Sequence, residues 1–143
     1  MHVAIEYGKK TYNVNLESLK GGKKTYKTIR VHHIYTDGSK KTEGTGGGFV
    51  IYHHKQIIHT QSFKMQDHAT AYQAELEAIY QACIYMDENH DKIKPKFVKI
   101  LTGSQAALKV LDSIDFKSTI ALKTAEALEN LNGESKRLYI SLA

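Results

Sequence analysis

The stretch VHHIYTDGS, residues 31–39, decides the fold. It is rich in β-branched and aromatic side chains and runs into Asp37-Gly38, which is the chemistry of a strand that enters a turn. Two more apolar runs follow, FVIYHH (49–54) and QIIHTQSF (56–63), with a short polar turn near Lys55 between them. This spacing predicts a hairpin, and the three runs together predict a three-stranded antiparallel meander.

Glycines cluster just before the second of these strands, at Gly44, Gly46, Gly47 and Gly48. A phosphate-binding loop follows a strand and opens a helix, whereas this cluster opens a strand. We therefore reject a phosphate-binding loop at this position.

The hydrophobic period becomes helical after the meander. AYQAELEAIYQACIYM (71–86) reads as a long helix that Thr70 caps and that ends before residues 89–95. The remaining predicted elements are a strand at 97–102, a helix at 104–114 capped by Ser104, a helix at 118–131 stopped by Asn132-Gly133, and a last strand at 137–143. The order βββαβααβ predicts an α/β domain with an α+β mixed sheet, in which helical crossovers connect the later strands.

The positive charge of the chain is concentrated before residue 31. Residues 1–30 contain seven Lys or Arg and two Glu, which equals the net charge of +5 of the whole chain. We expect residues 1–30 to be an irregular or weakly extended basic arm and residues 31–143 to form the domain. The arm could attract phosphates, or it could be a solvated linker from a longer polypeptide.

Composition argues against several other classes of protein. No apolar run approaches the roughly 20 residues of a membrane span, and Met1 is not followed by a signal-peptide pattern. The single cysteine, Cys83, excludes an internal disulfide and is expected to be buried in its helix. The eight histidines lack ligand-like spacing, which makes a structural zinc site improbable. We expect an intracellular protein, nuclear or cytoplasmic, that does not bind membranes.

Glu75 is the most informative single position. At about 100° per residue, Ala78, Ile79, Ala82 and Met86 share its side of the predicted helix, so the carboxylate lies in the middle of the apolar stripe. Burial of a carboxylate is costly unless it binds a cation or a hydrogen-bond donor. Alternatively, the side chain reaches the edge of the domain and meets water or a lysine.

Asp37 is the natural partner of Glu75. It lies at the predicted end of a central strand, where ligand and catalytic groups gather in α/β sheets. Asp-Gly at a strand end is also ordinary turn chemistry, which is the alternative interpretation.

The segments IYTDGSK, GTGGGFVIY, AYQAELEAI and ILTGSQAALKVL together resemble the ribonuclease H domain, most closely the version in reverse transcriptases of non-LTR retrotransposons. The resemblance covers about residues 35–143. It implies a ribonuclease H-like fold, with the meander, two parallel strands and helices packed on the sheet. It also implies an endonuclease that cuts the RNA strand of RNA/DNA hybrids, using four acidic residues and two Mg²⁺ ions, with Mn²⁺ as a possible substitute.

By this resemblance the first two acidic ligands are Asp37 and Glu75. Gly103 stands where the third should open a Thr-Asp-Ser-Gln motif, because the chain reads Thr102-Gly103-Ser104-Gln105. The fourth belongs to a C-terminal helix beyond the last strand, and we expect that helix to be missing. Asp112 and Asp115, the nearest acidic residues in sequence, are expected to project away. Asp37 and Glu75 alone are expected to hold Mg²⁺ weakly or not at all.

The resemblance also implies five contacts with nucleic acid, at Gly38, Ser39, Thr70, Ser104 and Gln105. Thr70 and Ser104 are equally plausible as helix N-caps, and Gln105 as an exposed helix residue. Recognition of a hybrid by such contacts depends on its shape and 2′-hydroxyl groups rather than on base sequence.

Three functions remain open at this point. The preferred one is a catalytically defective ribonuclease H-like domain that at most binds an RNA/DNA hybrid or another nucleic acid. The second is an active or weakly active hybrid endoribonuclease. The third is a protein-interaction module, in which a homodimer forms through an uncovered face of the sheet.

Overall fold

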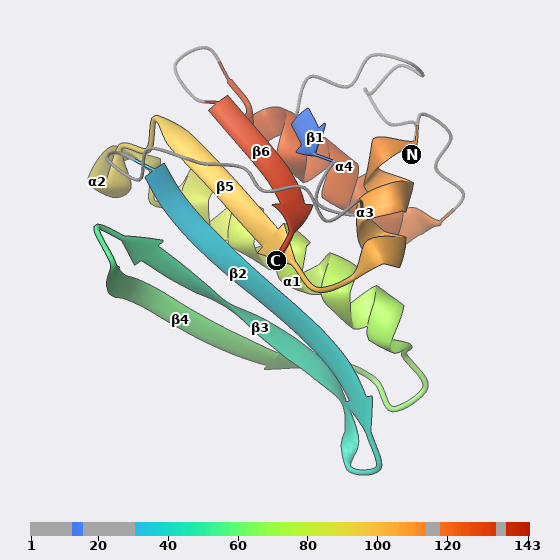
Figure 1. Cartoon of the computed structure of the whole chain (residues 1–143). Coiled ribbons are helices and arrows are strands. Elements are labelled where there is room, and N and C mark those ends of the chain that lie inside the picture. The colour runs from blue at the N-terminus through green and yellow to red at the C-terminus, as the bar shows by residue number, and fades with distance from the viewer. Residues whose placement is uncertain (1–12, 16–30, 114–117, 134–136) are drawn as a thin grey trace.

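The computed structural model describes residues 13–15, 31–113, 118–133 and 137–143 (Figure 1). The elements are β1 (Asn13–Asn15), β2 (Val31–Lys41), β3 (Gly44–His53), β4 (Gln56–Lys64), α1 (Ala71–Glu88), α2 (His90–Ile93), β5 (Phe97–Thr102), α3 (Gln105–Asp112), α4 (Thr119–Leu131) and β6 (Arg137–Leu142). No helix of these described segments is long and apolar enough to cross a membrane.

The strands form one mixed sheet in the order β1-β6-β5-β2-β3-β4. Strands β2, β3 and β4 are antiparallel neighbours, which confirms the predicted meander. Strand β5 pairs in parallel with both β2 and β6, as the helical crossovers require. The predicted α/β class with a mixed sheet is confirmed.

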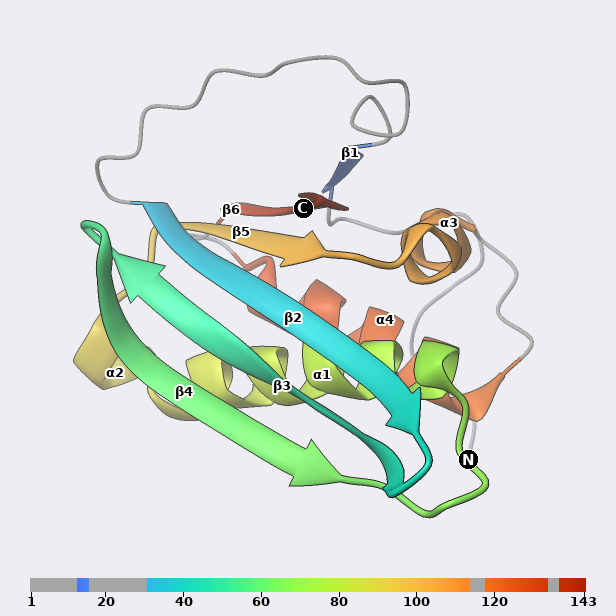
Figure 2. The same cartoon turned by 60° about the horizontal axis from the view of Figure 1, so that its bottom comes forward.

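Helices α1 and α4 lie together on one side of the sheet, and β2, β3 and β4 turn their other side away from them (Figure 2). Along each strand, side chains that face the helices alternate with side chains that face away. Those that face the helices include four fully buried isoleucines, Ile34, Ile51, Ile100 and Ile140. Helix α1 adds its predicted apolar stripe to this core, and Cys83 is buried within it, as expected. Burial raises the pKa of the Cys83 thiol.

The prediction that the first strand ends at Asp37-Gly38 is wrong. Strand β2 continues to Lys41, because residues 37–39 pair with the glycines Gly46–Gly48 of β3, and the turn lies at residues 42–43. The parallel pairing with β5 does end there, with Thr36 opposite Thr102. Asp37 therefore lies at the end of the parallel ladder but within the antiparallel one.

Part of the basic arm, predicted to be irregular or weakly extended, pairs with the sheet as a short strand. Asn13–Asn15 form β1, which pairs in parallel with residues 139–141 of β6. Three residues are too few to show a strand period, but β6 would otherwise present unpaired backbone groups, and β1 satisfies them. The rest of the arm lies outside the described residues. The short helix α2 was also not predicted.

The backbone of helix α1 comes very close to the sheet at Gly38. A Cβ atom placed at Gly38 would lie 2.5 Å from the carbonyl carbon of Ala74 and 2.8 Å from the Cα atom of Glu75, so only glycine fits. The backbone of the helix thus rests directly on β2 at the residue that follows Asp37.

We predict that Gly38→Ala lowers the free energy of unfolding by about 3 kcal/mol, because the added methyl group must push helix and strand apart. Gly103→Ala is the matched control, since a Cβ atom at Gly103 meets nothing within 4 Å. Urea unfolding of both variants measures the difference. Equal midpoints for the two variants would contradict the close packing.

A buried histidine lies near the start of β2. His32 is 4% exposed and stacks on His53 of β3, with ring centroids 4.0 Å apart. The Nδ1 atom of His32 has no hydrogen-bond partner among the described residues. Burial, followed by the charge of His53, lowers the pKa of His32 from its ordinary value of 6.5 to about 4.

Folding should therefore weaken with acid. The unfolded chain protonates His32 near pH 6.5 and the folded protein only near pH 4, so this contribution to stability is full above pH 6.5 and is lost as the pH falls toward 4. We predict that His32→Phe flattens the dependence of the free energy of unfolding on pH in this window. The exposed His68 supplies the control, His68→Phe. An unchanged slope in His32→Phe would show that another group is responsible.

Candidate functional site

Glu75 is buried between helix α1 and the sheet, with only 3% of the residue exposed. Its Oε1 atom accepts a hydrogen bond of 2.8 Å from Thr36 Oγ1 and a second one from Thr102 Oγ1. Thr102 Oγ1 in turn accepts a hydrogen bond of 3.1 Å from the backbone N–H of Ser104. The core-facing carboxylate predicted from the helical period thus has protein donors, which offset the cost of burying it.

These hydrogen bonds bring the three positions of the predicted acidic site together. Thr36 precedes Asp37, Thr102 precedes Gly103, and the two threonines are partners in the β2–β5 register. Because both hydroxyl groups reach the same oxygen of Glu75, the ends of the two parallel strands flank this carboxylate. The juxtaposition agrees with the rule that functional groups collect where parallel strands end.

Asp37 carries an exposed side chain near the Glu75 network, whereas Gly103 carries none. The Asp37 side chain is exposed, on the side of β2 opposite to the one that packs on α1. Gly103 is exposed and has open space where a side chain would extend. A carboxylate could occupy position 103 without displacing any neighbour.

The residues at this site do not fit a metal centre of the kind that the resemblance implies. No group of three or more His, Cys, Asp or Glu in the described part of the chain is arranged to hold a metal ion. One oxygen of Glu75 is already engaged by two hydroxyl groups, and glycine supplies no donor at position 103. Asp112 is the last residue of α3, and Asp115 lies outside the described residues.

Of the residues expected at the nucleic acid, two are helix caps. Thr70 forms a capping box with Gln73, with bonds of 3.0 Å and 2.9 Å, and Ser104 Oγ accepts a hydrogen bond of 3.0 Å from the backbone N–H of Ala107. Gln105 is the exposed first residue of α3, and Ser39 is half-buried on β2. Thr70 and Ser104 are therefore helix N-caps, which was the alternative to their predicted contact with nucleic acid.

A hollow of 460 Å³ adjoins Asp37 on the side of the sheet away from α1. Gly47 and Gly48 contribute to it from β3, and Thr60 and Ser62 from β4. Glycines allow another chain to come close to the strand backbone, and hydroxyl groups can hydrogen-bond to it. The sequence pattern placed these glycines just before a strand, whereas they lie within β3, and it did not indicate this concave surface.

Comparison with known proteins identifies the family. The RNase H family model matches residues 30–140, which is most of the chain. The chain belongs to the RNase H family. A search of curated proteins gave no match.

Several solved RNase H structures share this fold. RNase H1 of the archaeon Halobacterium salinarum has a TM-score of 0.59 at 20% identity, over 78% of this chain and 83% of that one. The N-terminal RNase H domain of a Mycobacterium tuberculosis protein has a TM-score of 0.62 at 16% identity, over 79% and 86%. LC11-RNase H1, isolated from compost by a metagenomic approach, has a TM-score of 0.63 at 21% identity, over 80% and 85%.

The partners of Glu75 were not anticipated from the sequence. Thr36 and Thr102 are β-branched residues on strands and read as ordinary strand formers. The available signal was that each directly precedes a residue of the predicted site, at the end of its strand. Only the sheet register shows that their hydroxyl groups converge.

We predict that Thr102→Val lowers the free energy of unfolding by about 2 kcal/mol, because a buried charged carboxylate loses a donor while the shape of the side chain is kept. Thr102→Ser, which keeps the hydroxyl group, is expected to lose less. Chemical unfolding monitored by circular dichroism tests the order. A larger loss in Thr102→Ser than in Thr102→Val would show that the methyl group, and not the hydrogen bond, is what matters.

Proposed function

We propose that this RNase H domain binds RNA/DNA hybrids where the parallel pairing of β2 and β5 ends, and that it is catalytically defective. The family supplies the substrate class. The defect is inferred from a single observation, which is that Gly103 supplies no carboxylate at a position where one would have open space beside the Glu75 network.

The loss of one acidic group should affect cleavage much more than binding. Hybrid cleavage in this family depends on charge held in a fixed arrangement, and a displacement of about 1 Å can cost on the order of a hundredfold in rate. Binding depends instead on many contacts with the backbone and groove of the hybrid. The residues proposed to make such contacts are Gly38, Ser39, Thr70, Ser104 and Gln105. Of these, Gly38 packs against the backbone at Glu75, and Ser104 hydrogen-bonds to Thr102 of the Glu75 network.

A second function, a weakly active endoribonuclease, is favoured by the hydrogen bonds that hold Glu75. Two hydroxyl groups hold this carboxylate in one position, and one of them belongs to Thr36, which directly precedes Asp37 on β2. An arrangement that is preserved to this degree would support residual cleavage.

The similarity of the motifs to retrotransposon reverse transcriptases is the basis for proposing a retroelement as the source of the domain.

The test is cleavage of a labelled RNA/DNA hybrid by the natural chain and by Gly103→Asp, each in Mg²⁺ and in Mn²⁺. We predict that Gly103→Asp cleaves on the order of a hundredfold faster, because the third carboxylate completes the acidic cluster. Both proteins should bind the hybrid with similar affinity.

Gly103→Asn is the matched control, since it adds a side chain of the same shape without the charge, and it should not accelerate cleavage. Glu75→Gln in the Gly103→Asp background should abolish the gain. If the natural chain cleaves as fast as Gly103→Asp, and Glu75→Gln abolishes that cleavage, the domain is an active enzyme and the proposed defect is wrong.

A further inference from the structure

A pair of aromatic rings, one exposed and one half-buried, lies on the side of the sheet away from α1. Tyr35 on β2 is 45% exposed, and its ring meets the ring of Tyr52 on β3 in an edge-to-face arrangement with centroids 5.6 Å apart. Exposed aromatic rings on a sheet are costly in water and are typical of surfaces that stack on a ligand. The Glu75 network lies on the other side of β2 and does not use these rings.

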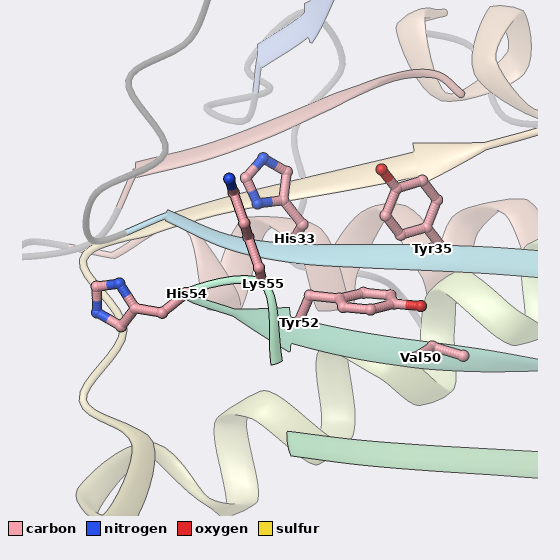
Figure 3. Close-up of a pocket in the computed structure, with 6 residues that line it drawn as sticks. All are labelled: His33, Tyr35, Val50, Tyr52, His54 and Lys55. Carbon is pink, nitrogen blue, oxygen red and sulfur yellow. The ribbon is translucent and has the colours of Figure 1, made fainter. Parts of the chain in front are cut away.

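The pair lines a shallow hollow of 470 Å³ (Figure 3). Val50 completes its apolar part, and three nitrogen-bearing side chains line the rest, namely His33, His54 and Lys55. Burial, followed by the charge of Lys99, lowers the pKa of His33, so His33 contributes an uncharged ring near neutral pH and Lys55 contributes the positive charge. Two aromatic rings that can stack on a base and the cation of Lys55 thus line one hollow.

This hollow adjoins the one beside Asp37, because Tyr35 and Val50 line both. Along β2 the outward-facing residues are His33, Tyr35 and Asp37, each about 7 Å from the next. A strip therefore runs from the β3–β4 turn, past the two tyrosine rings, to the exposed carboxylate and the glycines of β3.

We propose that this strip, from Lys55 through Tyr52 and Tyr35 to Asp37, binds a single-stranded RNA segment that continues from the hybrid at the candidate site. The inference rests on the proposed function. Bases stack on Tyr35 and Tyr52, and Lys55 meets the phosphates at the far end of the strip.

The chemistry of the strip favours RNA over a protein partner. Aromatic faces accept any base, a cation at one end suits a phosphate backbone, and the glycines beside Asp37 allow that backbone to approach the sheet. Thr60 and Ser62 line the same hollow and can hydrogen-bond to 2′-hydroxyl groups. A purely apolar dimer interface would not require polar side chains such as Lys55, Thr60 and Ser62 along the strip.

The experiment compares, by fluorescence anisotropy at low salt, a blunt RNA/DNA hybrid with hybrids extended at one end by single-stranded RNA or by single-stranded DNA. The natural chain should bind the RNA-extended hybrid roughly tenfold more tightly than the blunt one, and the DNA extension should add less. Replacing both rings, with Tyr35→Leu and Tyr52→Leu, should remove the gain and leave blunt-hybrid affinity unchanged. The paired Tyr→Phe replacements, which keep the rings, should retain it.

Other outcomes would overturn the inference. Intact binding of the blunt hybrid with no gain from the RNA extension, or with an equal gain from DNA, rejects the RNA strip and leaves the proposed function standing. Failure to bind the blunt hybrid rejects the proposed function and the strip with it. A mass that rises with concentration in the natural chain, but not in the Tyr→Leu variant, would assign this face to contact between copies of the chain.

Discussion

The contact between the backbone of α1 and β2 at Gly38 is the constraint on which the site depends. With no side chain between them, helix and strand lie close enough for the Glu75 carboxylate to reach the hydroxyl groups of Thr36 and Thr102. A larger residue at position 38 would separate the two elements and withdraw the carboxylate from the strand ends. The same glycine that permits the packing therefore positions the acidic group.

Strand β2 serves two different surfaces because its side chains alternate. Residues on one side, such as Ile34 and Thr36, build the core and hold Glu75, whereas Tyr35 and Asp37 face away from α1. The family match covers the fold that builds the first surface. The paired rings of Tyr35 and Tyr52 on the second surface are the basis of the proposed RNA strip. The Glu75 network and the proposed RNA strip lie on different sides of β2, so separate substitutions can test them.

Hydrophobic periods and capping residues within short segments predicted the helices, the strands and the side of the helix on which Glu75 lies. The strand and helix periods located the meander, the long helix and the core-facing position of Glu75, and Thr70 and Ser104 cap their helices as expected. Features that depend on pairing between distant segments were missed. The extension of β2 to Lys41 depends on the glycines of β3, β1 exists only through its pairing with β6, and the two threonines meet Glu75 only in the observed register. Gly38 was assigned to nucleic-acid contact by resemblance, and its packing against α1 became visible only in three dimensions.

The central claim is that Asp37 and Glu75 alone do not form a firm cation site because position 103 supplies no carboxylate. Calorimetric titration of Mg²⁺ into the natural chain and into Gly103→Asp measures this most directly, without a nucleic acid present. The account predicts no saturable binding to the natural chain and saturable binding to the variant. Saturable binding of equal affinity in both proteins would contradict it.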